Sequence, residues 1–138
     1  MKSFEFTIPG APKGKARPRV VNNHAYTPEA TVQYERLVQA CWEKAAGDWM
    51  ADKDQPVALY VSAYYPVPES HTKKQKEREL RNYVLPTKKP DIDNILKIIM
   101  DGLNGVAYHD DKQVVDVTIR KRFDSEPRVE VYLKEVAP

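Results

Sequence analysis

Residues 88–114, KKPDIDNILKIIMDGLNGVAYHDDKQV, hold acids whose types and spacing suit metal chemistry. Asp91 and Asp93 precede an apolar run, Lys97 follows one helical turn later, and an Asp-Asp pair at 110–111 comes after the run. Residues two apart point to the same side of an extended chain. Pro90 lies just before Asp91 and biases its own preceding residue, Lys89, to extended geometry. If residues 91–93 are extended, both carboxylates face one way at the positive end of the following helix.

A strand that returns past the start of this helix would bring Asp110 or Asp111 to Asp91 and Asp93. Three carboxylates without cysteine form an oxygen-only site, which selects Mg²⁺ or Mn²⁺ over zinc. Such a metal suits phosphodiester hydrolysis, because it activates water and clamps phosphate oxygens. Lys97 would neutralise charge on the phosphate in the transition state.

An ordinary helix cap explains part of the same pattern. Asp93 or Asn94 as the N-cap would be worth about 1 kcal/mol, with Asp91 favourable for the helix dipole. This alternative does not account for Lys97 on the same side or for the later Asp-Asp pair. The Asp-x-Asp spacing also occurs in nucleotide-sugar transferases, but the chain looks short for that chemistry and shows no nucleotide-binding loop.

The composition favours one domain over residues 1–138, the usual size of a single domain. No apolar run approaches the roughly 20 residues of a membrane span, and the alternating N-terminal sequence lacks a signal-peptide core. Cys41 is the only cysteine, which excludes an internal disulfide. We expect a cytoplasmic protein with no membrane partner and no organic cofactor.

The net charge is only +2, but the cations are segregated. Residues 13–19 read KGKARPR, and residues 71–89 carry seven lysines and arginines against two glutamates. Basic segments beside an acidic cluster suit a polyanion held over a metal site. The alternative is that these charge runs are merely solvated surface.

The elements that must position these residues follow from periodicity and punctuation. Strand 56–66 is apolar on both faces, which favours a central place in a sheet. The polar helix after it offers only Leu80 for burial, and the last two strands, joined by DSEPR, are expected to form a hairpin. We predict an α/β (mixed α+β) fold, with one mixed sheet covered by helices. The expected elements are strand 3–8, an extended arm from residue 9, a helix from an N-cap at Thr27 to near Gly47, strand 56–66, helix 70–82, helix 91–105, strand 112–123 and strand 129–136.

Two apolar stripes are expected to face the core. Trp42 and Trp49 are assigned to the core or to a dimer contact, and Cys41 to the core. His109, beside the acids, is more often a surface residue than a ligand or base in such a place. The expected stripes are Ala30, Tyr34, Leu37 or Val38, Cys41 and Ala45 in the first helix, and Ile95, Leu96, Ile99 and Leu103 in the last.

The whole pattern resembles the RusA family of Holliday-junction resolvases. It consists of a Lys-Pro-Asp-x-Asp-Asn entry at 89–94, a lysine at 97, Asp-Gly-Leu at 101–103 and Asp-Asp at 110–111. The PKGKARPR arm and the basic segment after the PVP turn are also similar to the family. The resemblance covers nearly the whole chain.

The resemblance implies a bacterial or phage endodeoxyribonuclease that acts as a homodimer on four-way DNA junctions, in DNA recombination and repair. It implies a need for Mg²⁺, with Mn²⁺ as a substitute, and paired symmetric nicks. Carried over by motif position, Asp91, Asp93 and Asp111 are the metal-binding and catalytic carboxylates, and Lys97 is the catalytic lysine. Asp110 remains an alternative to Asp111. The candidate DNA-binding residues are Lys13, Lys15, Arg17, Arg19, Lys73, Lys74 and Lys76.

Two rival functions remain open. One is a related nuclease with a broader preference for branched DNA. The other is a non-catalytic DNA-binding module that keeps the basic surface, against which the presence of all three acids and Lys97 argues.

Overall fold

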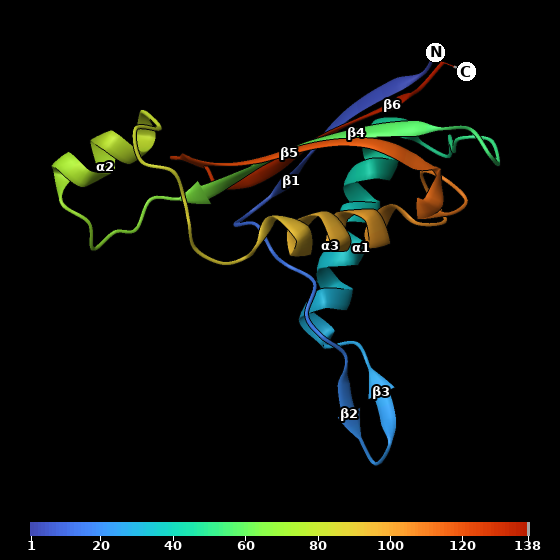
Figure 1. The fold of residues 1–138 in the computed structure, drawn as a ribbon, viewed down its shortest axis with the longest axis horizontal. Helices are drawn as coiled ribbons and strands as arrows, with labels where there is room; N and C mark the ends of the chain where they lie inside the picture. Colours follow the sequence, from blue (N-terminus) through green and yellow to red (C-terminus); the bar gives the residue numbers. More distant parts are fainter. Residues whose placement is uncertain (138) are drawn as a thin grey trace.

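A computed structural model describes residues 1–137 of the chain (Figure 1). One sheet carries helices on one side, while a small hairpin and a short helix project from the body. The elements are β1 (Ser3–Pro9), β2 (Arg19–Val21), β3 (His24–Tyr26), α1 (Glu29–Ala46), β4 (Val57–Pro66), α2 (Lys73–Leu80), α3 (Ile92–Leu103), a 3₁₀ turn η1 (Asp111–Gln113), β5 (Val114–Asp124) and β6 (Arg128–Glu135).

The sheet has the strand order β1-β6-β4-β5 and is mixed. β6 runs antiparallel to both β1 and β4, whereas β5 runs parallel to β4. The predicted central position of β4 is therefore confirmed, and so are the mixed sheet and the helices that cover it. One face of β4 is buried under the helices, whereas Tyr60 on the other face is 38% exposed.

The predicted hairpin between the last two strands is wrong. β5 and β6 do not pair, because β4 lies between them in the sheet. β4 is the most apolar strand and takes a central position with a paired strand on each side, which leaves the more polar β5 at an edge. The DSEPR connection therefore spans the width of one strand rather than forming a tight turn.

The crossover from β4 to β5 passes through α3 and fixes where the acids lie. α3 and α1 cover the same face of the sheet and cross each other closely (Figure 1). At the crossing, a Cβ on Gly102 would lie 2.8 Å from Cβ of Val38, so only glycine fits there. Fully buried side chains at this layer include Val38, Trp42, Ile95, Ile98, Ile99, Leu103, Tyr108 and Leu133.

The helix predictions were right in extent and partly wrong in detail. α1 ends at Gly47 as expected, but Pro28 rather than Thr27 is its N-cap, and no side chain caps it. Leu80 of α2 is 46% exposed, contrary to expectation. Glu79 is buried instead, and its carboxylate lies 2.8 Å from Nδ1 of His71.

The expected arm is irregular over residues 10–18, but its last residues begin an unexpected hairpin of β2 and β3. Asn22 and Asn23 both have positive φ, the geometry of a two-residue hairpin turn that asparagine tolerates. The hairpin stands away from the sheet, and Val20 is 69% exposed (Figure 1). Among residues 1–137, no helix is both long and apolar enough to cross a membrane.

Candidate active site

The first part of the candidate site is the start of α3. Asp91 is the N-cap residue in extended geometry, and its carboxylate makes no capping hydrogen bond. Tyr65 at the end of β4 donates its hydroxyl to the carbonyl of Pro90 at 2.6 Å, which fixes the entry to the helix. The helix cap is thus made without the Asp91 side chain, whose oxygens stay exposed to solvent. Helical geometry begins at Ile92, so Asp93 already lies in the first turn.

The second part of the site is the turn before β5. Asp110 caps this turn, since its Oδ1 accepts the amide of Lys112 at 2.9 Å. The buried Gln113 side chain accepts the amides of His109 and Asp110, and donates to the carbonyls of Asp52 and Gln55. These four bonds, 2.8 to 3.1 Å long, hold the turn rigidly.

Asp110 and Asp111 have different electrostatic environments. The backbone hydrogen bond from Lys112 lowers the pKa of Asp110. Partial burial, together with hydrogen bonding and charge repulsion from Asp110, raises the pKa of Asp111, whereas Lys97 opposes that rise. The Asp110 side chain therefore stabilises the turn, whereas the Asp111 side chain does not cap it.

Four charged side chains form a chain of ion pairs along α3. Nζ of Lys97 lies 3.4 Å from Oδ1 of Asp101, and Nζ of Lys15 lies 3.1 Å from Oδ2 of the same residue. Lys15 also contacts Oε2 of Glu35 at 2.8 Å. Burial acts to lower the pKa of Lys15, but the hydrogen bonds to Glu35 and Asp101 raise it overall. Lys15 is thus held by two carboxylates in this structure.

One chain does not bring the three predicted metal ligands together. Asp91 lies near Tyr65 at the end of β4, while Asp111 precedes Val114, which pairs with Val57 at the start of β4. β5 does return past the start of the helix, where Nζ of Lys121 donates to the carbonyl of Lys88. Asp110 and Asp111 precede the strand, however, so the expectation that they join Asp91 and Asp93 is wrong within one chain. A parallel strand must begin at the opposite end of the sheet from where its predecessor ended, and α3 spans that distance, roughly 18 Å at 1.5 Å per residue.

The donor chemistry fits Mg²⁺, but its geometry within one chain does not. The carboxylates of Asp91, Asp93 and Asp111 are hard oxygen donors. Over residues 1–137, no group of three or more His, Cys, Asp or Glu side chains is spaced to hold a metal ion. The assignment of these acids as ligands stays a prediction.

The basic arm packs against the start of α3. The amide of Lys15 donates to the carbonyl of Asn94 at 3.0 Å, and a Cβ on Gly14 would lie 2.9 Å from Pro90. A hollow of about 390 Å³ is formed between the arm, the start of α1 and Ile98 of α3. Its cationic lining residues are Lys13, Arg17 and Arg19.

The second basic group lies on α2. Lys73 and Lys74 are exposed, and Lys76 is half-buried. α2 projects beyond the sheet on the side toward which the start of α3 points (Figure 1). The two groups of cations therefore flank the Asp91 end of the helix rather than the Asp111 end.

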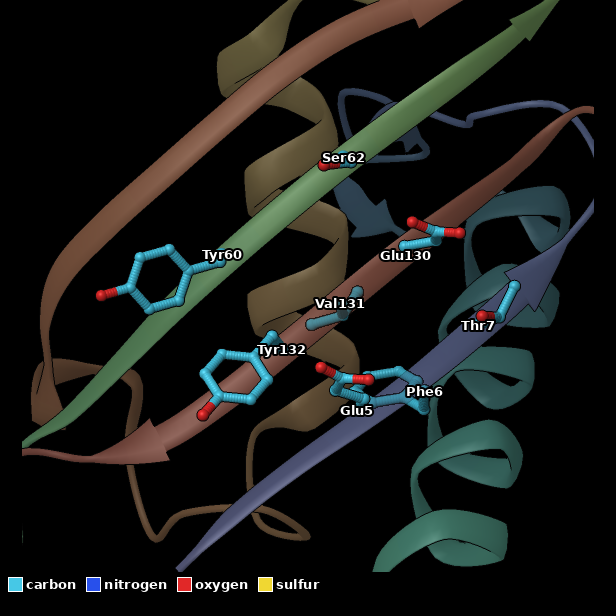
Figure 2. Close-up of a pocket in the computed structure, with 8 residues that line it drawn as sticks. All are labelled: Glu5, Phe6, Thr7, Tyr60, Ser62, Glu130, Val131 and Tyr132. Carbon is cyan, nitrogen blue, oxygen red and sulfur yellow. The ribbon is translucent and has the colours of Figure 1, made fainter. Parts of the chain in front are cut away.

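A second hollow, of about 420 Å³, lies on the sheet face opposite the helices (Figure 2). Figure 2 shows Tyr60 and Tyr132 on neighbouring strands, with Glu5 and Glu130 beside them and the helices behind the sheet. The two tyrosine rings are 5.7 Å apart. None of the predicted site residues lines this hollow.

Sequence reasoning missed the residues that support the site. Gln113 could have been found, because Asp110-x-x-Gln113 is a capping-box spacing. Tyr65 and Glu35 carry no local signal, since they act on residues far along the chain. Their roles depend on the crossover and on the crossing of α1 with α3.

Comparison with known proteins identifies a family that contains this fold and site. The family described as "Endodeoxyribonuclease RusA" matches residues 9–134, nearly the whole fold including both acidic ends of α3. The chain belongs to this RusA family of endodeoxyribonucleases.

Two relatives were found. The chain is 35% identical over 143 residues to "Uncharacterized protein YqaN" of Bacillus subtilis (strain 168), covering 99% of each chain. It is 31% identical over 86 residues to "Crossover junction endodeoxyribonuclease rusA" of Lactococcus phage r1t, covering 62% of this chain and 59% of the phage protein.

Proposed function

We propose that this endodeoxyribonuclease resolves four-way DNA junctions by paired symmetric nicks, as a Mg²⁺-dependent homodimer in DNA recombination and repair. The observation that carries the proposal is the free Asp91 carboxylate. A carboxylate at the N-cap that makes no capping bond is available for another task, and here Asp93 and Lys97 follow it on the same helix. The family membership and the name of the phage relative support DNA junctions as the substrate.

The chain's own residues supply binding and positioning. Lys13, Arg17 and Arg19 line one hollow beside α3 and would contact phosphates, with Lys73, Lys74 and Lys76 on α2 as a second contact. Backbone contacts of this kind set affinity and salt dependence, not sequence choice. Lys15 is held by Glu35 and Asp101, so we assign it to positioning the arm rather than to DNA.

Lys97 is the charged group next to the scissile phosphate in this proposal. Its side chain is 59% exposed, and its contact with Asp101 at 3.4 Å is long. An exposed ammonium on a rigid helix can leave such a contact and stabilise a phosphorane-like charge. A bound Mg²⁺ would supply an activated water and neutralise the leaving oxygen.

A second copy of the chain would complete the metal site. Asp91 and Asp93 lie at one end of α3, and Asp111 lies beyond the other. A two-fold axis that sets two α3 helices in opposite directions would place the first end of one copy beside the second end of the other. Two such sites also suit a substrate with two equivalent strands to cut.

The test is a nicking assay on an end-labelled four-way junction, with linear duplex of the same sequence beside it. We expect paired symmetric nicks on the junction in Mg²⁺ or Mn²⁺ and none in EDTA. Cutting of flaps and duplex at the same rate would favour the broader branched-DNA nuclease. Tight junction binding without cutting in either metal would contradict the proposal and favour a binding module.

A further inference from the structure

The hairpin of β2 and β3 carries apolar side chains that the chain itself does not bury. All residues of its two strands are exposed, and the hairpin projects from the body (Figure 1). Val20, Val21 and Tyr26 are 69%, 52% and 46% exposed. Side chains this exposed add little to a core, and a bare two-stranded hairpin is only marginally stable in water. They are therefore available for contact with another molecule.

These apolar side chains lie on both faces of the hairpin. Val20 pairs with Ala25 across the two strands. Successive residues of a strand point to opposite faces, so Val20 and Ala25 lie on one face and Val21 and Tyr26 on the other. A hairpin that docks on a single surface needs only one apolar face, whereas a hairpin that inserts between two surfaces needs two. The pattern therefore favours insertion.

The apolar part is at the narrow end of the hairpin. Asn22 and Asn23 form a two-residue turn, with φ of 52° and 64°. Val21 and His24 are the pair next to this turn, and Val20 comes one position behind. The two valines are thus the large side chains that an inserting tip would bring in first.

The root of the hairpin is fixed beside the Asp91 end of α3. The amide of Lys15 donates to the carbonyl of Asn94 at 3.0 Å, and the amide of Ala16 donates to Oγ1 of the buried Thr31 in α1 at 3.4 Å. The turn begins six residues beyond Ala16, which is a reach of roughly 20 Å at 3.3 Å per residue. The tip therefore lies within about six base-pair steps, at 3.4 Å each, of a DNA strand held beside Asp91.

Cations lead along the arm to the hairpin and stop where the apolar part begins. Lys13, Arg17 and Arg19 line the hollow beside α3, and Arg19 pairs with Tyr26 at the base of the hairpin. Residues 20–26 contain no lysine or arginine. Cations position a nucleic acid through its phosphates. This order fits a DNA whose backbone follows the arm while its bases meet the tip.

The chemistry of the tip favours contact with base faces rather than base edges. Base edges in a groove are recognised mainly by hydrogen bonds, which valine side chains cannot make. Apolar side chains instead enter between base steps and unstack them, and tyrosine stacks on a base. Insertion into a continuous duplex costs the stacking of a base step. At a branch the strands leave the duplex, so the base pairs there part more easily.

We propose that the β2–β3 hairpin is a wedge that enters the branch point of the DNA and makes the chain select branched over continuous duplex DNA. Val20 and Val21 lie against the base pairs on its two sides, and Tyr26 stacks on a base. This inference rests on the proposed function, because it names how the nuclease recognises a four-way substrate. The cations of the arm hold the backbone of either kind of DNA, so they do not discriminate between them.

Polar substitution of the wedge tests the inference without changing the cations. In the triple variant Val20→Ser/Val21→Ser/Tyr26→Ser, affinity for a four-way junction should fall roughly tenfold, because the contacts with base faces are lost. Affinity for linear duplex should stay within about twofold, because the phosphate contacts remain. Fluorescence anisotropy of labelled junction and labelled duplex, titrated with the full chain in EDTA, measures both affinities.

A fluorescent base reports the insertion directly, since 2-aminopurine is quenched when stacked and bright when unstacked. At the branch point it should brighten at least about twofold when the natural chain saturates the junction, and the saturating triple variant should leave it unchanged. At about ten base pairs from the branch, beyond the reach of the tip, it should respond to neither protein.

Tyr60→Ser is the matched control, because Tyr60 is also a partly exposed tyrosine but lies on the sheet face opposite the helices (Figure 2). It should keep the natural affinities and the natural brightening, and circular dichroism should show that every variant is folded. A folded triple variant with natural junction preference and natural brightening would overturn the proposal. So would the same losses in Tyr60→Ser, or an equal loss of affinity for junction and duplex. A variant that changes only the sedimentation of the protein would assign the hairpin to a protein contact instead.

The outcomes separate this inference from the proposed function. If brightening at the branch depends on the wedge residues but no junction is cut in Mg²⁺ or Mn²⁺, the wedge stands and the nuclease proposal fails. If the triple variant cuts and brightens the junction as the natural chain does, the nuclease stands and the wedge fails.

Discussion

Adjacent acids in this chain have separate tasks because their backbones differ. Asp110 accepts an amide hydrogen bond and closes a turn, while Asp111 next to it is raised in pKa by burial and by its neighbour. The same division holds at the start of α3, where the Asp91 backbone caps the helix and its carboxylate does not. Asp91 and Asp111, two of the acids proposed for catalysis, thus have side chains that the local structure does not need.

The first prediction concerns Asp93. Asp93→Asn should lower junction cutting by at least roughly a hundredfold, because a neutral amide holds a cation far less well than a carboxylate. Junction binding should persist, since the basic residues are untouched. Single-turnover cleavage and a gel-shift assay of the same preparation measure the two properties.

Asp48→Asn, an exposed acid just after α1, is the control and should cut normally. Equal cutting by Asp93→Asn and the natural chain would remove this residue from the catalytic set. Loss of binding together with cutting would instead mean that the residue supports the fold or the DNA surface.

At the scale of elements, the basic arm contains lysines of two kinds. Lys15 is mostly buried between Glu35 and Asp101, so Lys15→Met should cost about 1–2 kcal/mol of unfolding free energy by stranding two carboxylates. Lys13 is exposed beside the proposed phosphate site, so Lys13→Met should leave stability unchanged and weaken junction binding. It should also lower the slope of log affinity against log salt by about 1.

Urea unfolding and salt titrations of binding measure these effects in one pair of variants. An unchanged salt slope in Lys13→Met would exclude a phosphate contact there. A stable Lys15→Met variant with a reduced slope would reverse the two assignments.

The connection between β5 and β6 predicts a pH dependence. The amide of Glu126 and the guanidinium of Arg128 lower the pKa of Asp124 below its ordinary value. A carboxyl whose pKa is lower in the folded state stabilises the protein at pH values above its unfolded-state pKa. This contribution is lost as the pH falls through the folded-state pKa. Asp124→Asn should therefore cost about 0.5 kcal/mol at neutral pH, a small value for a partly exposed pair, and nothing near pH 2.

Thermal unfolding at the two pH values tests this. Glu126→Gln is the control, because Arg128 contacts the backbone carbonyl of Glu126 rather than its side chain, and it should show no pH-dependent difference. A cost for Asp124→Asn that stays constant at both pH values would exclude the ionised carboxylate as its cause.

At the scale of the molecule, metal binding and dimerisation should be linked. If each metal site takes carboxylates from two copies, Mn²⁺ binds the dimer better than the monomer and must strengthen it. We expect the dimer dissociation constant to fall by roughly tenfold in millimolar Mn²⁺ and to return in EDTA. Sedimentation with and without Mn²⁺ measures this, and Asp93→Asn should abolish the shift.

Only part of the fold and of the candidate site can be predicted from the sequence. The acids, the extent of α3 and the central place of β4 carry local signals in residue type, capping and apolar pattern. The predicted pairing of β5 with β6 is wrong because a parallel crossover and a hairpin share the same strand patterns. Which of the two forms depends on the packing of both strands against β4, and no local pattern encodes that packing. The separation of Asp91 from Asp111 follows from that pairing, so it could not be foreseen from spacing.

The pairing of β1 with β6 has a consequence for biosynthesis. Ser3 pairs with Lys134, and Pro9 pairs with Arg128, so β1 has no partner strand until the residues of β6 have been made. β4 also lacks β6 until then, although β5 is already present. We therefore expect a ribosome-bound chain ending before residue 128 to be protease-sensitive, and the sheet to form in a late, cooperative step once β6 inserts between β1 and β4.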